Sequence, residues 1–321
     1  MPSRNIRVAF FGYHNAGVKC LDHLLRSGAE IALVVTNRPY EGEVVWYDSL
    51  AEYAKNHDIS YYEIESLSDV QLNALVEDSQ PDILFSIAFR QMIPTEVLSI
   101  PPKGSINLHD SLLPRYRGFT PSTWVIINGE QETGVSLHYM TDKADIGDIL
   151  AQLPVTIEPD ETGHGLNLKL TDASLEIFKN ILPLVADGTV RPTPQDESKA
   201  TYFGRRGVNE NDDLINWNWE SLRIYNLVRA ITFPYPGAFT FYKSRKLMVW
   251  QGKATDWPVE NMDWRPPGTI LAMDGNAAVI QTGSGCFSIL KAQFGGNEYK
   301  PEYPGYLGLR EGEVLTETLE H

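Results

Sequence analysis

Short apolar runs alternate with segments of helical periodicity along the first part of the chain. The runs at 6–13, 30–37, 59–65, 82–89 and 104–109 are predicted strands. Residues 15–28, 46–58 and 68–80 have apolar positions at helical spacing, with Gly28 typical of a helix end and Ser68 of a helix start. Strands that are apolar on both faces and alternate with helices favour a parallel sheet covered by helices. We therefore expect an α/β fold with a Rossmann-like, open, parallel-rich sheet.

The pattern changes in the second half of the chain. Residues 133–141 and 147–157 are further predicted strands, and 162–188 is a long predicted helix that ends at Gly188. A polar segment with two prolines follows, and after it a helix at 219–232 precedes short strands separated by glycine turns, which favours a small, OB-like β-barrel. The expected organisation is a catalytic domain at 1–190, a linker at 191–207, a β-barrel domain at 208–310 and a tail at 311–321. The last three residues of that tail resemble a tag remnant.

Composition narrows the class of protein. Hydrophobic residues make up 42% of the 321 residues and charged residues 21%, which is typical of a soluble globular protein. The sequence contains neither a membrane-spanning apolar stretch nor a signal-peptide pattern, so we expect no membrane association. Cys20 and Cys286 lie far apart without metal-site spacing, which favours a reducing, cytoplasmic location and predicts no metal.

The net charge of −15 restricts the partners that the chain can bind. A chain this acidic repels polyanions unless it carries a local basic patch, and no Lys/Arg run is longer than two. This weighs against a nucleic acid as substrate. It leaves room for a small anionic substrate, which a few arginines can hold.

Candidate chemistry is concentrated where the predicted strand at 104–109 ends. Asn107 and His109 are two residues apart, so on a strand they share one face, at the end where open α/β sheets bind ligands. An amide N–H can stabilise an oxyanion, and an imidazole can move a proton near neutral pH. The pair therefore suits direct attack of an amine or water on a carbonyl carbon, although such residues also commonly cap a loop.

An acid partner for the histidine is expected nearby. The stretch "MTDKADIGDIL" offers Asp142, Asp145 and Asp148, and Asp145 lies in a loop between two predicted strands. A carboxylate there would favour the imidazolium form, but an aspartate in this position can also be a plain turn residue. "GYHNAG" after the first strand lacks the G-x-G-x-x-G pattern, so a dinucleotide site is not indicated.

"NLHDSLLPRYRG" resembles the signature of the folate-dependent formyltransferases, and 128–152 and 228–239 resemble later blocks of that family. The resemblance implies N10-formyltetrahydrofolate as formyl donor and no metal. It implies that Asn107 holds the formyl oxygen, that His109 is the acid/base and that Asp145 keeps it protonated. The folate would lie against two loops, contacting Ile87, Ala88, Phe89 and Arg90 in one and Thr141, Asp142, Lys143 and Ala144 in the other.

The acceptor is inferred from the rest of the chain. The chain resembles most closely the sugar N-formyltransferases, such as the one that formylates UDP-4-amino-4-deoxy-L-arabinose, which implies a nucleotide-linked amino sugar and a role in lipopolysaccharide biosynthesis. Methionyl-tRNA formyltransferases carry a basic insertion after the second strand, where this chain has a single arginine in 36–54. Methionyl-tRNA formylation, formyltetrahydrofolate hydrolysis and plain ligand binding remain alternatives.

Several residues are expected to bind the sugar nucleotide. Aromatic and basic side chains after the first strand and along the family blocks are the candidates: Tyr13, His14, Trp46, Arg90, Arg117, Arg205 and Arg206. Phe119 stands where the arabinose enzyme has an arginine, so a folate contact at this position stays open. A homodimer is also consistent with the resemblance.

Overall fold

The computed structural model describes residues 6–66, 72–206, 209, 211–256, 265–296 and 298–318. These residues form two compact units. The first unit comprises Met1–Pro121, Glu132–Thr156 and Leu168–Gly204, and the second comprises Ser122–Gln131, Ile157–Asn167 and Arg205–His321. The predicted helix start at Ser68 lies outside the described residues.

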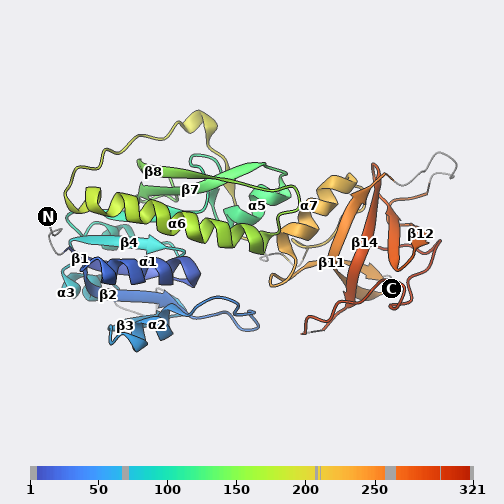
Figure 1. The fold of residues 1–321 in the computed structure, drawn as a ribbon, viewed down its shortest axis with the longest axis horizontal. Helices are drawn as coiled ribbons and strands as arrows, with labels where there is room; N and C mark the ends of the chain where they lie inside the picture. Colours follow the sequence, from blue (N-terminus) through green and yellow to red (C-terminus); the bar gives the residue numbers. More distant parts are fainter. Residues whose placement is uncertain are drawn as a thin grey trace. The chain divides into compact units, whose positions relative to one another are not determined.

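The first unit contains a seven-stranded sheet with the strand order β3-β2-β1-β4-β5-β7-β8 (Figure 1). Its strands are β1 (Arg7–Gly12), β2 (Glu30–Asn37), β3 (Tyr61–Ile64), β4 (Ile83–Ile87), β5 (Ser105–His109), β7 (Glu132–Tyr139) and β8 (Ile149–Thr156). The first five pair in parallel, whereas β7 and β8 are antiparallel to their neighbours. The predicted parallel-rich α/β sheet is confirmed.

Helices cover both faces of this sheet, so its central strands are buried. On one face Ala9, Phe11 and Leu84 pack with residues of α3 (Leu72–Ser79) and α4 (Thr95–Leu98). On the other face Phe85 meets Phe178 of α6 (Gly163–Ala186) edge to face, with ring centroids 4.9 Å apart. There α6 runs beside α1 (His14–Arg26), and the ion pair Lys19–Asp172 joins the two helices (Figure 1). The short helix α2 (Leu50–Asn56) follows the loop after β2.

The second unit is built on a five-stranded antiparallel sheet with the order β10-β11-β14-β13-β12. The strands are β10 (Ala238–Tyr242), β11 (Arg245–Thr255), β12 (Ile270–Asp274), β13 (Ala277–Gln281) and β14 (Cys286–Phe294). Helix α7 (Ser221–Ile231) precedes them, and the hydroxyl of Thr232 at its end donates to the Trp250 carbonyl of β11. The helix and the small antiparallel β-structure expected after the linker are confirmed.

Some short elements have no counterpart in the predicted pattern. They are α5 (Pro121–Ile127), the 3-10 helix η2 (Glu197–Lys199), β6 (Arg117–Gly118) and β9 (Tyr202–Phe203). β6 and β9 pair in parallel, so the end of the segment expected to be a linker packs against the loop that follows β5. None of the helices in the described parts of the chain is long and apolar enough to cross a membrane.

Candidate active site

The site is centred on the end of β5, between β4 and β7. Asn107 and His109 lie two residues apart on this strand, and the His109 side chain is only 7% exposed. Nε2 of His109 lies 2.7 Å from the carbonyl of Tyr116, which can only accept, so Nε2 carries a proton. Nδ1 lies 3.6 Å from Oδ1 of Asp145, beyond hydrogen-bond distance. Nδ1 is therefore the ring nitrogen that can exchange a proton with a substrate.

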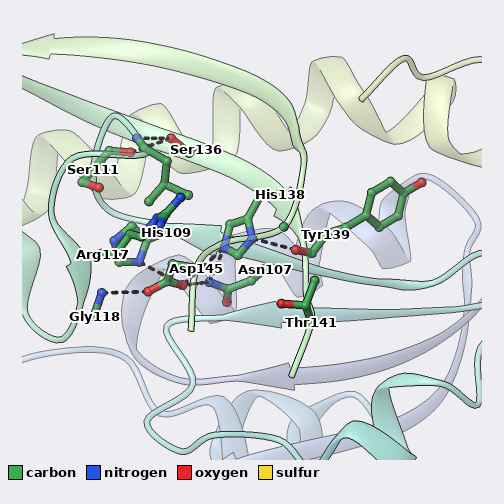
Figure 2. Close-up of polar contacts among 12 residues, drawn as sticks. Asn107, His109, Ser111, Arg117, Gly118, Ser136, His138, Tyr139, Thr141 and Asp145 are labelled. Atoms are coloured by element: carbon green, nitrogen blue, oxygen red, sulfur yellow. Dashed lines mark hydrogen bonds and ion pairs between the residues drawn. The ribbon is translucent and has the colours of Figure 1, made fainter. Parts of the chain in front are cut away.

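The carboxylate of Asp145 contacts residues of three strands (Figure 2). Its Oδ1 lies near His109 of β5 and 3.4 Å from Nε2 of His138 on β7, while Oδ2 accepts from the N–H of Gly118 on β6 at 2.8 Å. Burial raises the pKa of this carboxyl, but the two histidines and the Gly118 N–H outweigh it and hold the pKa well below its ordinary value. Asp145 is therefore a carboxylate at any pH near neutrality and places a negative charge beside the two histidines.

The amide of Asn107 is oriented by the same carboxylate. Its Nδ2 lies 3.5 Å from Oδ1 of Asp145 and 3.2 Å from Nε2 of His138. Because the carboxylate only accepts, the amide nitrogen and not its oxygen must face it. Nε2 of His138 itself lies 3.4 Å from Oδ1 of Asp145, so the amide nitrogen, the imidazole and the carboxylate meet in one cluster at the end of β5.

The two loops expected to bind folate both adjoin β5. Ile87 is the last residue of β4 and pairs with Leu108, and Ala88 after it has a left-handed backbone with φ 55°. Phe89 packs edge to face on Phe11, with ring centroids 5.3 Å apart. The second loop, 141–144, leads from β7 to Asp145. The structure thus places both predicted loops beside Asn107 and His109, and folate contacts there remain a prediction.

A second cluster lies where β1, β2 and β4 end, which is the kind of crevice that binds ligands in such sheets. Arg90 lies over the rings of Tyr13 and Tyr40, with its guanidinium carbon 4.2 and 4.9 Å from the ring centroids. Both terminal nitrogens of Arg90 donate to Glu43, one of them at 2.7 Å. His14 contacts Trp46 edge to face at 4.5 Å between ring centroids. Four of the residues expected to bind the sugar nucleotide, Tyr13, His14, Trp46 and Arg90, are therefore gathered in one cluster.

The other three arginines expected to bind the substrate lie elsewhere. Arg117 is fully buried, and all five of its N–H groups are bonded to acceptors from residues 195–202 of the first unit. Arg205 and Arg206 belong to the second unit, where Arg206 donates to Asp213 at 2.7 Å and lies over the ring of Trp124. These contacts favour structural roles for Arg117 and Arg206, and substrate binding by the three arginines stays a prediction.

Sequence reasoning missed three residues of the site. His138 lies opposite Asn107 in the antiparallel β5–β7 register, which is only known once the strands are paired. Asp110 follows His109 directly, and burial raises the pKa of its carboxyl while the neighbouring His109 opposes that rise. Gln195 donates to two carbonyls of the Asp145 loop, although its sequence surroundings predict only a linker.

In the described parts of the chain, no cluster of His, Cys, Asp and Glu side chains could hold a metal ion.

This arrangement, an amide donor and an imidazole beside a carboxylate at the end of a parallel-rich sheet, suits a transferase that acts on a carbonyl carbon. Residues 5–182 match the model of the formyl transferase family, and residues 208–302 match that of the formyl transferase C-terminal domain. The chain therefore belongs to the formyl transferase family and is a formyl-transferring enzyme.

Solved structures of the same fold include several enzymes that formylate sugars. WlaRD, a sugar 3N-formyl transferase solved in the presence of dTDP and 5-N-formyl-THF, is 23% identical over 91% of this chain and 98% of that chain, with a TM-score of 0.67. An N-formyltransferase from Helicobacter canadensis, in complex with folinic acid and dTDP-3-aminofucose, is 24% identical over 90% and 100% of the two chains, also at 0.67. A 4-N formyltransferase from Francisella tularensis is 18% identical over 73% and 91%, at 0.58.

Proposed function

We propose that this chain transfers the formyl group of N10-formyltetrahydrofolate to the amine of a nucleotide-linked amino sugar. The observation that carries the proposal is the cluster of Asn107, His109 and Asp145 at the end of β5. The substrate class is supported by the fold shared with WlaRD and the Helicobacter canadensis enzyme, whose structures were solved with dTDP or a dTDP-sugar and a formyl-folate.

The chemistry is a direct transfer without an acyl-enzyme. The amine nitrogen attacks the formyl carbon, and the bond from that carbon to N10 of the folate then breaks. The amide of Asn107 is the donor for the oxygen that becomes negative in the transition state. One proton must leave the amine and one must reach N10, and Nδ1 of His109 is the group that transfers it. Asp145 stabilises the charged imidazole while it holds this proton.

The cluster around Arg90 is the proposed nucleotide site. Its aromatic rings offer surfaces on which a base can stack, and Arg90 offers the cation that a diphosphate requires. Glu43 already pairs with Arg90, so a diphosphate would compete with this carboxylate for the guanidinium. Binding of the nucleotide would then release the loop at 38–48 from Arg90.

The experiment is a panel of UDP- and dTDP-linked 3-amino and 4-amino sugars, each incubated with N10-formyltetrahydrofolate and analysed by mass spectrometry. We expect one of them to gain a single formyl group, in step with the tetrahydrofolate released. The Arg90→Ala variant should raise the KM for that sugar nucleotide, whereas Arg38→Ala, at an exposed arginine of the same loop, should leave it unchanged. Formyl release at the same rate with and without every sugar would replace this function with hydrolysis of the folate.

A further inference from the structure

Asp145 sits in a backbone conformation that needs support. Its φ of 57° is left-handed, which is costly for a residue with a side chain. Two residues later, Gly147 passes so close to β7 that a Cβ there would lie 1.8 Å from the carbonyl oxygen of Tyr139. The direction of the carboxylate therefore depends on how the backbone of residues 145–147 is held.

Gln195 holds this backbone from the segment that follows α6. Its Nε2 donates to the carbonyl of Asp145 at 2.8 Å and to the carbonyl of Gly147 at 2.7 Å, so both amide hydrogens are used. One side chain thus spans the turn and holds the Asp145–Ile146 and Gly147–Asp148 peptides.

Arg117 determines which way the Gln195 amide faces. Its Nε and one terminal nitrogen donate to Oε1 of Gln195 at 3.1 and 2.7 Å. A guanidinium has no acceptor, so the amide oxygen must face Arg117 and the amide nitrogen must face the Asp145 loop. Arg117 is itself fixed, because it is fully buried and donates to both carboxylate oxygens of Glu197.

Strand β6, which contains Arg117, also supports the Asp145 carboxylate through its backbone. Arg117 and Gly118 form β6, and the N–H of Gly118 donates to Oδ2 of Asp145 at 2.8 Å. β6 pairs with β9, and a Cβ on Gly118 would lie 2.3 Å from the Phe203 carbonyl oxygen. The backbone of β6 thus holds the carboxylate, while its Arg117 side chain, through Gln195, holds the backbone of the Asp145 turn.

We propose that Gln195, oriented by Arg117, is a positioning residue for Asp145, so that the segment after α6 helps to build the active site. This inference rests on the proposed function for its kinetic consequence. Gln195 touches neither His109 nor Asn107 in the contacts described above, and it acts through the direction of the Asp145 carboxylate. That carboxylate faces His109 from β5, His138 from β7 and the Gly118 N–H from β6.

The test compares Gln195→Ala and Gln195→Glu with wild type. The glutamate variant keeps the shape and still accepts from Arg117, but it cannot donate to the two carbonyls, so it tests the proposal even if the alanine variant does not fold. Gln293→Ala is the matched control, because Gln293 is also a glutamine whose amide bridges backbone groups, there in the second unit.

Two readouts separate positioning from general stability. We expect kcat for the amino sugar to fall about tenfold or more in both Gln195 variants, with KM changed less than twofold, because small displacements of catalytic groups cost this much. We also expect carboxyl ¹³C NMR to show the pKa of Asp145 moving up toward its ordinary value, since the carboxylate loses its fixed partners. Gln293→Ala should change neither.

The outcomes are distinguishable. If wild type formylates no sugar, the proposed function fails, but the Asp145 titration still tests the role of Gln195. If the Asp145 titration in both variants matches wild type, the inference is wrong, whatever happens to kcat. If that titration moves while kcat and its pH dependence stay within twofold of wild type, Gln195 positions Asp145 without catalytic consequence, and the inference is equally overturned.

Discussion

At the scale of single residues, the charge of Asp145 links stability to pH. The pKa of Asp145 in the folded chain is well below the ordinary value of about 3.9. The charged carboxylate therefore stabilises the fold above about pH 3.9, and this stabilisation is lost as the pH falls from there through the pKa of the folded chain. We expect Asp145→Asn to lower the free energy of unfolding at pH 6 by about 1–3 kcal/mol. The difference should shrink at pH 3, as measured by urea unfolding at both pH values. A difference of equal size at both would contradict the assigned charge.

His109 is the residue on which the proposed proton transfer depends. Glutamine in its place can still donate to the Tyr116 carbonyl but cannot carry a proton between substrate atoms. We expect His109→Gln to lower kcat about a hundred- to ten-thousand-fold, the usual effect of removing a general acid/base. His57→Gln is the control, because His57 is an exposed histidine that bonds to Tyr53 at the end of α2. Turnover of His109→Gln above about a tenth of wild type would rule out this role.

The sequence allows some of these residues to be predicted, and physical reasons explain why others are missed. Asn107 and His109 share a strand, and the two-residue period alone places them on one face. Selecting Asp145 from the three aspartates of its loop needed the family resemblance, because turn residues have no period. His138 and Gln195 reach the site only through strand pairing and through the return of the segment after α6, which local patterns do not encode.

At the scale of elements, the turn between β7 and β8 is set by Gly147. A methyl group there would overlap the Tyr139 carbonyl, so the turn would have to move and carry Asp145 with it. We expect Gly147→Ala to lower kcat about tenfold or more. We also expect it to lower the midpoint of thermal unfolding. Gly204→Ala serves as control, because a Cβ at Gly204 would meet nothing within 4 Å and its φ is not positive. Unchanged kcat in Gly147→Ala would show that the turn tolerates displacement.

Elements with a clear hydrophobic period were predictable, and very short ones were not. Strands such as β4 are buried on both faces, so a continuous apolar run identifies them. β6 and β9 have two residues each, too few for any period, and they exist because their pairing joins distant segments. The same pairing explains why the segment expected to be a linker, rich in proline and polar residues, contacts the site. The domain boundaries expected from the sequence remain predictions.

At the scale of the whole molecule, net charge bears on the choice between the proposed acceptors. The chain carries a net charge of −15, and Arg90, Arg117 and Arg206 each pair with a carboxylate of the same unit. Binding of a polynucleotide depends on unpaired cations that contact phosphates and weakens steeply as salt rises. A single diphosphate needs only one exchangeable arginine, such as Arg90. The acidic chain therefore favours a sugar nucleotide over tRNA.

This argument predicts that methionyl-tRNA is not a substrate. We expect no saturable formylation of methionyl-tRNA by N10-formyltetrahydrofolate at about 0.15 M salt, because the net charge of −15 repels the polyanion. Formylation of the amino sugar, measured in parallel at low and moderate salt, should change much less, since one bound diphosphate involves few counterions. The measurement is the rate of formyl transfer at increasing tRNA concentration under both conditions. Efficient, saturable transfer to methionyl-tRNA would overturn the choice of acceptor and leave the roles of Asn107, His109 and Asp145 unchanged.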